Sequence, residues 1–270
     1  MSQHHQRAML RVVSYLSPLL DDLYQSLATY VGEQIGIPVH FSTGQSLEDF
    51  TSGRADMGFL SGLISAQIEH LPLCPIELVA APVLQGVRYR GTPLSFADVI
   101  VRSDSSYTSL LDLRGSVWAY TETPFSSGYH LVRQRLAQRG FPSDYFRWVI
   151  ATNSQLQSVQ AILHGHADAT AVDSHVLAIF LQKEPERLAA LRVIDTFGPP
   201  QVTPVVLSKA LAPSLRQCIQ EALLSIHLTP QGTRLLQAGL LERFLPLGHE
   251  NEPHVSSLPL FSPAQPCARS

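Results

Sequence analysis

Short apolar runs alternate with amphipathic stretches along most of this chain. Between residues 19 and 35, Leu20, Leu23, Leu27 and Val31 recur at the spacing of one helix face. Short apolar runs bounded by Gly, Pro or polar clusters are typical of buried strands. Strands are predicted over residues 10–15, 39–42, 56–60, 76–82, 96–102, 117–120, 148–151, 168–172, 191–195 and 202–207. Helices are predicted over residues 19–35, 47–52, 155–164, 174–182, 214–227 and 230–238, with two more opening at Ser61 and Ser126.

The order of these elements predicts an α/β fold of mainly parallel sheets flanked by helices, because strand and helix alternate in β-α-β units. A second set of units begins at Phe96, and the prolines of residues 198–200 suit an extended segment that carries the chain back. We therefore expect two lobes. Residues 1–93 together with 197–270 form the first lobe, and residues 94–196 form the second.

Composition narrows the class of protein. Hydrophobic residues make up 45% of the chain and charged residues 15%, so a large core can form and disorder is not expected. The net charge is −3 with acids and bases mixed, which argues against a nucleic-acid partner. No apolar run reaches about 18 residues, so no transmembrane segment is expected. The three cysteines are far apart and form no CxxC pair or Cys/His cluster, so neither a zinc site nor a disulfide framework is expected. No other metal and no cofactor is expected either.

Residues 123–130 (TPFSSGYH) connect a predicted strand to a predicted helix and are the strongest candidate for chemistry. Ser126, Ser127 and Gly128 open that helix. The first N–H groups of a helix have no partner within it, and the helix dipole favours negative charge there. This turn therefore predicts an anion site. A plain helix N-cap is the alternative, because Ser before a helix also caps it.

Other stretches match sequence patterns of one protein family. Residues 53–62 (GRADMGFLSG) and 96–105 (FADVIVRSDS) resemble its first-lobe stretch and its crossover strand. Residues 110–115 (LLDLRG) resemble the segment that introduces its second lobe. Residues 124–128 (PFSSG) resemble its anion loop, and residues 165–174 (GHADATAVDS) end in a matching Ala-Val-Asp-Ser. The chain thus resembles the PhnD family, the phosphonate- and phosphite-binding solute-binding proteins of ABC transporters, over most of its length.

The resemblance implies a two-lobed type II periplasmic-binding fold with a ligand cleft between the lobes. It also implies a small oxyanion-bearing solute, possible contact with an ABC permease, and a periplasmic location. Ligands of open α/β lobes bind beyond the carboxyl ends of the strands, and the matching stretches lie at such ends. The ligand-binding residues implied in this way are Tyr15, Phe59, Phe96, Tyr120, Phe125, Ser126, Ser127, Gly128, Asp173 and Ser174.

Several of these assignments have a structural alternative. Asp173 accepts hydrogen bonds when ionised, so it would repel a fully deprotonated anion and tolerate a ligand that keeps a proton or carries an amine. It suits a helix N-cap equally well. Tyr15 and Tyr120 offer hydroxyls to a ligand, and each is equally consistent with a core aromatic.

The chain departs from the family pattern in ways that bear on the ligand. Phe125 stands where the family usually has a hydroxyl, which removes one donor from the anion loop. Phe59, Leu60 and Phe96 are apolar where the family's first-lobe site usually carries Tyr. A pocket with fewer donors and more hydrocarbon suits a larger or less charged ligand than phosphite.

Two classes of function are consistent with the sequence. The first is a binding protein that delivers a solute to an ABC importer or reports it to a sensor. The second is an enzyme or a cytosolic sensor that reuses the same fold. The polar residues 1–7 show no signal-peptide pattern, so either an exported form was trimmed or the protein is cytoplasmic. His164-Gly165-His166 is better explained as a turn after a helix than as a metal site, and no nucleophile motif is present, which favours a binding protein.

Overall fold

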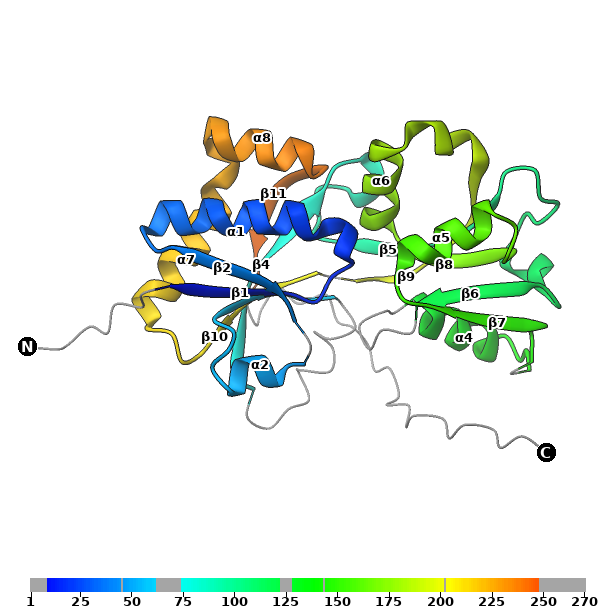
Figure 1. Cartoon of the computed structure of the whole chain (residues 1–270), viewed down its shortest axis with the longest axis horizontal. Coiled ribbons are helices and arrows are strands. Elements are labelled where there is room, and N and C mark those ends of the chain that lie inside the picture. Colours follow the sequence, from blue (N-terminus) through cyan, green and yellow to red (C-terminus); the bar gives the residue numbers. More distant parts are fainter. Residues whose placement is uncertain are drawn as a thin grey trace, which may run out of the picture.

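Two β-sheets lie side by side, and helices pack against each of them (Figure 1). The structure is a computed structural model that describes residues 9–44, 46–61, 74–121, 128–142, 144–201 and 203–247. The predicted helix after Ser61 and most of the candidate anion loop, residues 122–127, lie outside these ranges.

The first sheet combines strands from both ends of the sequence. Its described strands are β1 (Leu10–Ser14), β2 (Val39–Thr43), β3 (Met57–Phe59), β4 (Ile76–Leu84), β10 (Val205–Ser208) and β11 (Leu241–Pro246). They are ordered β11-β4-β10-β3-β1-β2. β1 pairs in parallel with β2 and β3. β10 lies antiparallel between β3 and β4, and β11 is antiparallel to β4.

The second sheet is formed by the middle of the chain. Its described strands are β5 (Ser95–Arg102), β6 (Val117–Thr121), β7 (Trp148–Thr152), β8 (Ala169–Asp173) and β9 (Leu191–Gln201). They are ordered β7-β6-β8-β5-β9. β6 is parallel to β7 and β8, whereas β5 is antiparallel to both β8 and β9.

The α/β architecture matches the prediction, and both sheets are mixed rather than simply parallel. β1 to β4 point the same way, because β10 is antiparallel to both β3 and β4. The mixed pairing arises where the chain changes sheets. β10 follows the return from the second sheet and inserts between two strands that were formed earlier in the sequence. Alternation of strands and helices predicts the β-α-β units but carries no signal for where a returning strand inserts.

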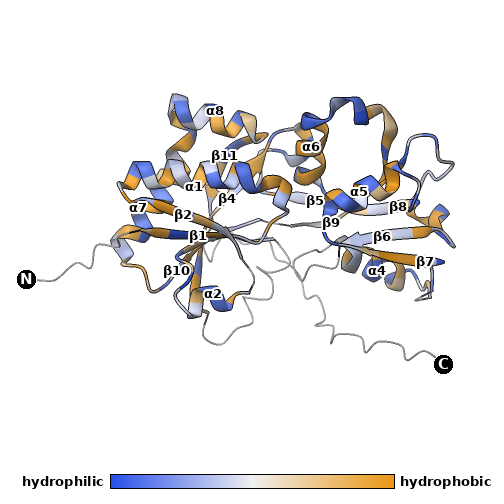
Figure 2. Ribbon diagram, in the orientation of Figure 1, coloured by the Kyte–Doolittle hydropathy of each residue, from blue (hydrophilic) through white to orange (hydrophobic). Residues whose placement is uncertain are grey.

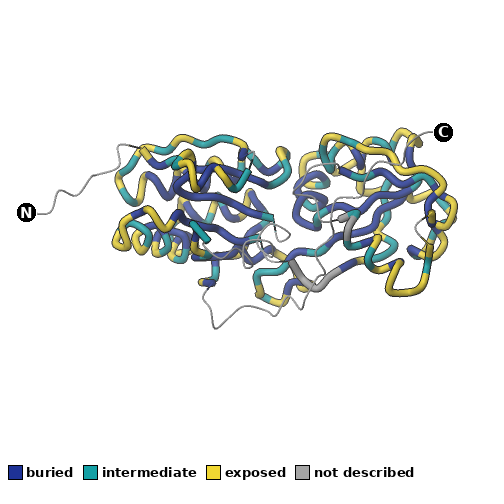
Figure 3. Tube along the Cα trace, turned by 90° about the horizontal axis from the view of Figure 1, so that it is seen from below, coloured by how far each residue is buried: buried dark blue, intermediate teal, exposed yellow. Residues whose placement is uncertain are grey.

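Helices pack on the sheets and alternate between hydrophobic and hydrophilic residues along their length (Figure 2), and most of their buried residues are apolar. Strands are largely buried, and much of the helical surface is exposed (Figure 3). The described α-helices are α1 (Asp21–Ile35), α2 (Glu48–Thr51), α4 (Gly128–Gln138), α5 (Gln155–Leu163), α6 (Ser174–Lys183), α7 (Pro213–Ser225) and α8 (Pro230–Ala238). The described 3-10 turns are η1 (Pro18–Leu20), η2 (Val87–Tyr89), η3 (Leu110–Leu113), η4 (Pro185–Ala190) and η5 (Ile226–Leu228).

Helix boundaries follow local signals in the sequence. α1 ends at Gly36, whose φ of 69° is the left-handed conformation that Gly adopts without strain. Ser154 caps α5 and Thr229 caps α8, each accepting a backbone N–H with its side-chain oxygen. His164 and Gly165 form the turn after α5, with Gly165 at a φ of 73°. The predicted turn at this His-Gly-His sequence is therefore confirmed.

β11 is the one strand of the described sheets that the sequence analysis does not predict. Its buried residues Leu241 and Phe244 are three apart, which is not the alternation expected of a strand. The cause is a register shift between Leu241 and Arg243 in the pairing with β4. Such an irregularity adds a residue and breaks the two-residue period on which the prediction depends.

Two crossing segments join the sheets, and a buried carboxylate ties the first of them to two strands of the second sheet. The first runs from β4 to β5 and includes η2, and the second runs from β9 to β10. Arg88 of η2 donates two hydrogen bonds to Asp98 of β5, with Nη1–Oδ2 at 2.9 Å and Nη2–Oδ1 at 2.7 Å. The Thr196 hydroxyl of β9 also donates to Asp98 Oδ1, at 2.8 Å. Asp98 is 1% exposed, so this carboxylate relies on these partners for its charge.

The apolar core is continuous from one sheet to the other. Tyr24 of α1 belongs to the same buried cluster as Val176, Leu177 and Phe180 of α6. α6 follows a strand of the second sheet, whereas α1 packs on the first sheet. α6 also contacts η1, the turn that precedes α1. The start of α6 is therefore the place where the second sheet's helices meet the first sheet's helices.

Candidate functional site

The carboxyl ends of strands from the two sheets meet near the start of α6. β6 and β8 are parallel neighbours, so their carboxyl ends share one edge of the second sheet. β1 and β3 are parallel neighbours in the first sheet, with Ser14 opposite Phe59 at their carboxyl ends. Tyr24 links the two edges, since its ring lies 4.5 Å from that of Phe59 and 6.4 Å from that of His175. Ligands of α/β sheets bind at such edges.

Asp173 ends β8 and caps α6. Its Oδ1 accepts the backbone N–H groups of His175 at 2.8 Å and Val176 at 3.3 Å. Its own backbone N–H donates to Oε1 of Gln155 at 2.8 Å. Burial of the carboxyl raises its pKa, and the imidazole of His175 and the cap hydrogen bonds oppose this shift. The predicted helix cap is thus present, and the same residue lies at the strand edge where the site is expected.

Phe96 and Ser174 lie against each other, as expected for residues of one site. The Ser174 hydroxyl oxygen accepts the backbone N–H of Phe96 at 3.0 Å, because β5 pairs with β8 so that Ala97 lies opposite Asp173. The Phe96 ring stacks on Tyr89 at a centroid distance of 5.8 Å. The structure therefore brings together three of the predicted site residues, Phe96, Asp173 and Ser174.

An arginine lies on the Phe96 ring. The guanidinium carbon of Arg88 is 4.7 Å from the centroid of Phe96, a cation–π contact. The hydrogen bonds to Asp98 are the main cause of the raised pKa of Arg88, and Asp173 adds to it. The positive charge of Arg88 near the candidate site is thus already paired with the buried carboxylate of Asp98.

Phe59 is buried at the end of β3, where it packs on Tyr24 and offers no hydroxyl. Tyr24, which packs on it, is also buried, and burial raises the pKa of its phenol. The sequence analysis did not select Tyr24. Its position on the apolar face of α1 predicts a core residue and gives no signal that the helix reaches toward α6.

Tyr120 packs against the start of α4. It is in β6, and its ring stacks on Tyr129 of α4 with centroids 4.7 Å apart. Tyr129 in turn receives a hydrogen bond of 3.5 Å from Nη1 of Arg133 at its hydroxyl. Gly128 is the first residue of α4, as expected for the end of the loop, whereas Phe125, Ser126 and Ser127 lie outside the described residues.

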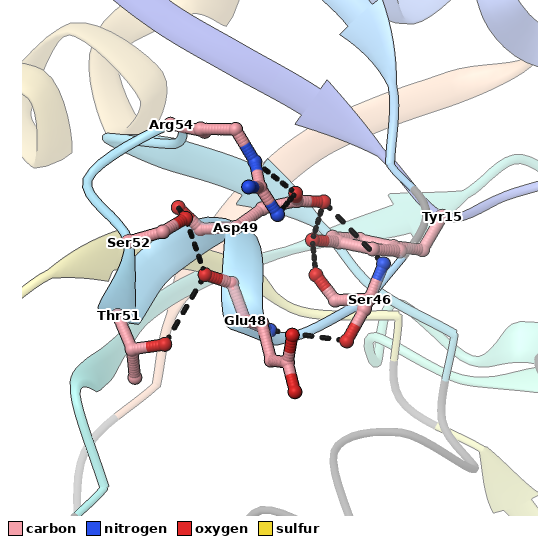
Figure 4. Close-up of polar contacts among 7 residues, drawn as sticks. All are labelled: Tyr15, Ser46, Glu48, Asp49, Thr51, Ser52 and Arg54. Atoms are coloured by element: carbon pink, nitrogen blue, oxygen red, sulfur yellow. Dashed lines mark hydrogen bonds and ion pairs between the residues drawn. The ribbon is translucent and has the colours of Figure 1, made fainter.

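Tyr15 lies in the buried core of the structure, as expected from one of the two alternatives left by the sequence. It is 2% exposed, and its hydroxyl lies 2.8 Å from the Ser46 carbonyl oxygen and 3.0 Å from Oδ2 of Asp49 (Figure 4). Burial raises the pKa of this phenol, and the hydrogen bond to Asp49 adds to the shift. Arg54 holds the other side of the same carboxylate, with Nε–Oδ1 at 3.0 Å. The Tyr15 hydroxyl therefore organises the α2 region.

Gly44 explains how Tyr15 reaches that position. A Cβ atom at Gly44 would lie 2.3 Å from Cε1 of Tyr15, which is far closer than atoms can approach. The ring thus packs directly on the backbone after β2.

Within the described residues, no group of three His, Cys, Asp or Glu side chains is arranged to hold a metal ion. No described helix is long and apolar enough to cross a membrane.

A protein-family model matches residues 11–251 of the chain, and its description is an ABC transporter, phosphonate, periplasmic substrate-binding protein. The chain belongs to this family. Proteins of this family bind substrates for transport and are not enzymes, and the family is periplasmic. No curated protein sequence matches the chain.

Solved structures share the fold at low sequence identity. The binding protein of an ABC phosphonate transporter from Pseudomonas aeruginosa has a TM-score of 0.74 and 16% identity, with 88% of this chain and 81% of that chain covered. PhnD1 from Prochlorococcus marinus, in complex with methylphosphonate, has a TM-score of 0.72 and 15% identity, with 90% and 94% covered. An ancestral arginine-binding protein bound to arginine has a TM-score of 0.61 and 16% identity, with 86% and 98% covered. These similarities confirm the two-lobed periplasmic-binding architecture predicted from the sequence.

Proposed function

We propose that this chain captures a small phosphonate-like solute between its two lobes and presents it to an ABC permease outside the cytoplasm. The observation that carries the proposal is the edge of the second sheet where Gly128 opens α4 and Asp173 caps α6. The start of α4 offers backbone donors to an oxyanion, whereas the N–H groups of His175 and Val176 at the start of α6 already donate to Asp173. Contacts of Tyr24 and His175 bring this edge against the first sheet, so groups from both sides can reach one small molecule.

The lobes of the proposal follow the two sheets. The division expected from the sequence, 1–93 with 197–270 and 94–196, remains our proposal, with one refinement at the return crossing. β9 pairs with β5 as far as Gln201, opposite Ser95. The crossing into the first sheet therefore falls between Gln201 and Val205, a few residues later than the sequence suggests.

The proposed ligand contacts come from both lobes. Phe59 and Phe96 supply apolar walls, and the Tyr120–Tyr129 stack borders the start of α4. Asp173 and Ser174 supply the polar end of β8. The anion loop itself is proposed to consist of Phe125, Ser126, Ser127 and Gly128. Tyr15 is left out, because its hydroxyl is bonded within the first lobe.

Binding is proposed to close the lobes without any reaction. The start of α6 lies beside the crossing from β4 to β5, since Ser174 accepts the Phe96 N–H and the Phe96 ring stacks on Tyr89 of that crossing. A rotation about the crossings moves such nearby contacts least and moves the far ends of the lobes most.

Calorimetric titration tests the proposal directly. We expect methylphosphonate, ethylphosphonate or phosphite to bind with one-to-one stoichiometry, and acetate, which has one carboxylate and no phosphorus oxyanion, serves as the control. Small-angle scattering with and without the best ligand should show compaction. Turnover of the bound compound that is abolished by Asp173→Asn would instead support the enzyme alternative.

Two further experiments test the permease and the location. Ligand-stimulated ATP hydrolysis of the reconstituted transporter tests the permease, and periplasmic fractionation of the host tests the location.

A further inference from the structure

β7 is an edge strand whose apolar side chains are exposed. It forms one end of the second sheet, and no described strand pairs with its outer side (Figure 1). Trp148 is 63% exposed, and Val149 and Ile150 are exposed as well. An edge strand leaves a row of backbone N–H and C=O groups open to another strand. β7 therefore offers apolar surface and open backbone groups at the same place.

The other ends of the two described sheets carry features that discourage pairing. β11 contains Glu242, Arg243 and Pro246, and β9 contains Arg192 and Asp195. The apolar residues of β2 are partly buried against the core. Charged side chains and proline on edge strands are a usual protection against association. β7, with the sequence WVIAT, has neither.

The surroundings of β7 are uncharged, which bears on the kind of partner. No Asp, Glu, Lys or Arg occurs from Trp148 to Leu163, a stretch that includes β7 and α5. α5 packs beside β7, where the hydroxyl oxygens of Thr152 and Ser158 lie 2.7 Å apart. A charged peptide or a nucleic acid would find no complementary charge on this stretch, whereas a second copy of it would meet no repulsion.

The strand also fits a second copy of itself by size. In an antiparallel pair centred on Ile150, Trp148 lies opposite Thr152 of the other copy, and Val149 lies opposite its Ala151. Each large side chain thus meets a small one. Trp148 and Ile150 share one face of the strand, because side chains alternate along it. Trp148 of one copy is then diagonal to Ile150 of the other, within reach of an aromatic ring.

We propose that β7 is a self-association surface, at which two copies of the chain pair their β7 strands antiparallel about a twofold axis at Ile150. A twofold axis uses the same surface on both copies, so the contact closes at a dimer. Five residues make a small interface, so the dimer is weak and forms at high concentration. The contact lies two strands away from Asp173 of β8 and leaves the candidate site open. The inference does not depend on the proposed function.

Sedimentation velocity of the wild-type protein at concentrations from about 1 to 200 µM tests the association. The chain has two tryptophans, and Trp118 is fully buried, so quenching of fluorescence by acrylamide reports mainly on Trp148. We expect a shift from monomer to dimer over this range of concentration. We also expect quenching of Trp148 to fall as the dimer forms.

Charge substitutions at the twofold axis test the geometry. Ile150→Lys and Ile150→Glu each place two like charges opposite each other, so each variant alone should stay monomeric. An equimolar mixture of the two variants should dimerise again, because opposite charges then face each other across the axis. Val193→Lys is the matched control and should dimerise as the wild type does, since Val193 is an exposed apolar residue of β9, at the other end of the same sheet.

The remaining outcomes each overturn a defined part. A wild type that stays monomeric throughout overturns the proposal, and protection of Trp148 in that monomer would show that the same chain covers β7. If the Ile150 variants dimerise as tightly as the wild type, the surface is wrong. If their mixture stays monomeric, the twofold register is wrong. Trp148→Lys, at the exposed start of the strand, decides the surface if circular dichroism shows that the Ile150 variants do not fold.

Discussion

Nε2 of His175 lies 2.8 Å from the carbonyl oxygen of Gly239, and this hydrogen bond joins the first turn of α6 to the residue after α8. A carbonyl oxygen only accepts, so Nε2 carries the hydrogen. The imidazole is 5% exposed, and this burial lowers its pKa, while the nearby Asp173 opposes the shift. A neutral histidine thus connects the second sheet's helix to the first lobe.

We predict that stability falls as the pH drops below about 6.5 because of His175. The unfolded chain takes up a proton near that pH, whereas the folded state, with its lowered pKa, takes it up only at lower pH. The contribution of His175 to stability is therefore complete above the pKa that this residue has in the unfolded chain. Below that pKa the contribution is lost, by no more than about 1.4 kcal/mol per pH unit. Urea unfolding of the wild type and His175→Gln between pH 7.5 and 5.5 measures this, since Gln keeps a donor for Gly239.

Two controls isolate the effect. His227→Gln changes an exposed histidine and should leave the pH slope unchanged. Asp173→Asn is measured in parallel, because the raised pKa of Asp173 acts in the opposite direction and removes stability as the pH rises above about 4. Equal slopes for the wild type and His175→Gln would show that His175 does not titrate differently in the two states.

The sequence predicts the site best where one short segment carries both the strand end and the helix start. Asp173 and Ser174 follow an apolar strand directly, so their place at a sheet edge could be predicted from order alone. Tyr24 and Arg88 could not, because their roles depend on contacts with residues far away in the sequence, His175 and Asp98. Helical spacing and charge carry no information about such partners.

Asp21 illustrates a different limit. An acidic residue in the first turn of a helix is explained by the helix dipole, so the sequence gives no reason to look further. Only the burial of its Oδ1 without a partner sets it apart from Asp22, which shares the same turn. The difference between the two residues is geometric and depends on where η1 places them.

Tyr15→Phe is predicted to reduce stability without reducing ligand affinity. The change removes the hydroxyl that bonds Asp49 and the Ser46 carbonyl, and it leaves a carboxylate only 7% exposed with one partner fewer. The expected loss is about 1–3 kcal/mol in the free energy of unfolding. Urea unfolding and titration with methylphosphonate measure the two effects. Tyr107→Phe, a half-buried tyrosine away from Asp49, is the control, and a large loss of affinity in Tyr15→Phe would return Tyr15 to the site.

The pair Arg88 and Asp98 is predicted to behave as a coupled unit. Arg88→Met leaves the buried Asp98 carboxylate with the Thr196 hydroxyl but without its guanidinium, and should cost about 2–4 kcal/mol. Asp98→Asn in the Arg88→Met background should cost much less than in the wild type, because the unpaired charge is gone. A double-mutant cycle by urea unfolding measures the difference, and additive losses would contradict the coupling.

Ser126→Ala and Ser127→Ala are predicted to weaken binding and to leave the fold intact. Ser126 and Ser127 precede Gly128, the first residue of α4, and in the proposed site their hydroxyls act with the backbone donors of that helix start on the oxyanion. Loss of one hydrogen bond to a charged ligand costs about 1.5–3 kcal/mol, or roughly 10- to 150-fold in affinity. Loss of a plain N-cap costs about 1 kcal/mol of stability and leaves the affinity nearly unchanged.

Thermal melting and titration with methylphosphonate separate the two roles. Ser154→Ala, at the cap of α5, is the matched control and should change only the melting temperature. If Ser127→Ala matches that control in both assays, the anion loop is a helix cap and the oxyanion binds elsewhere.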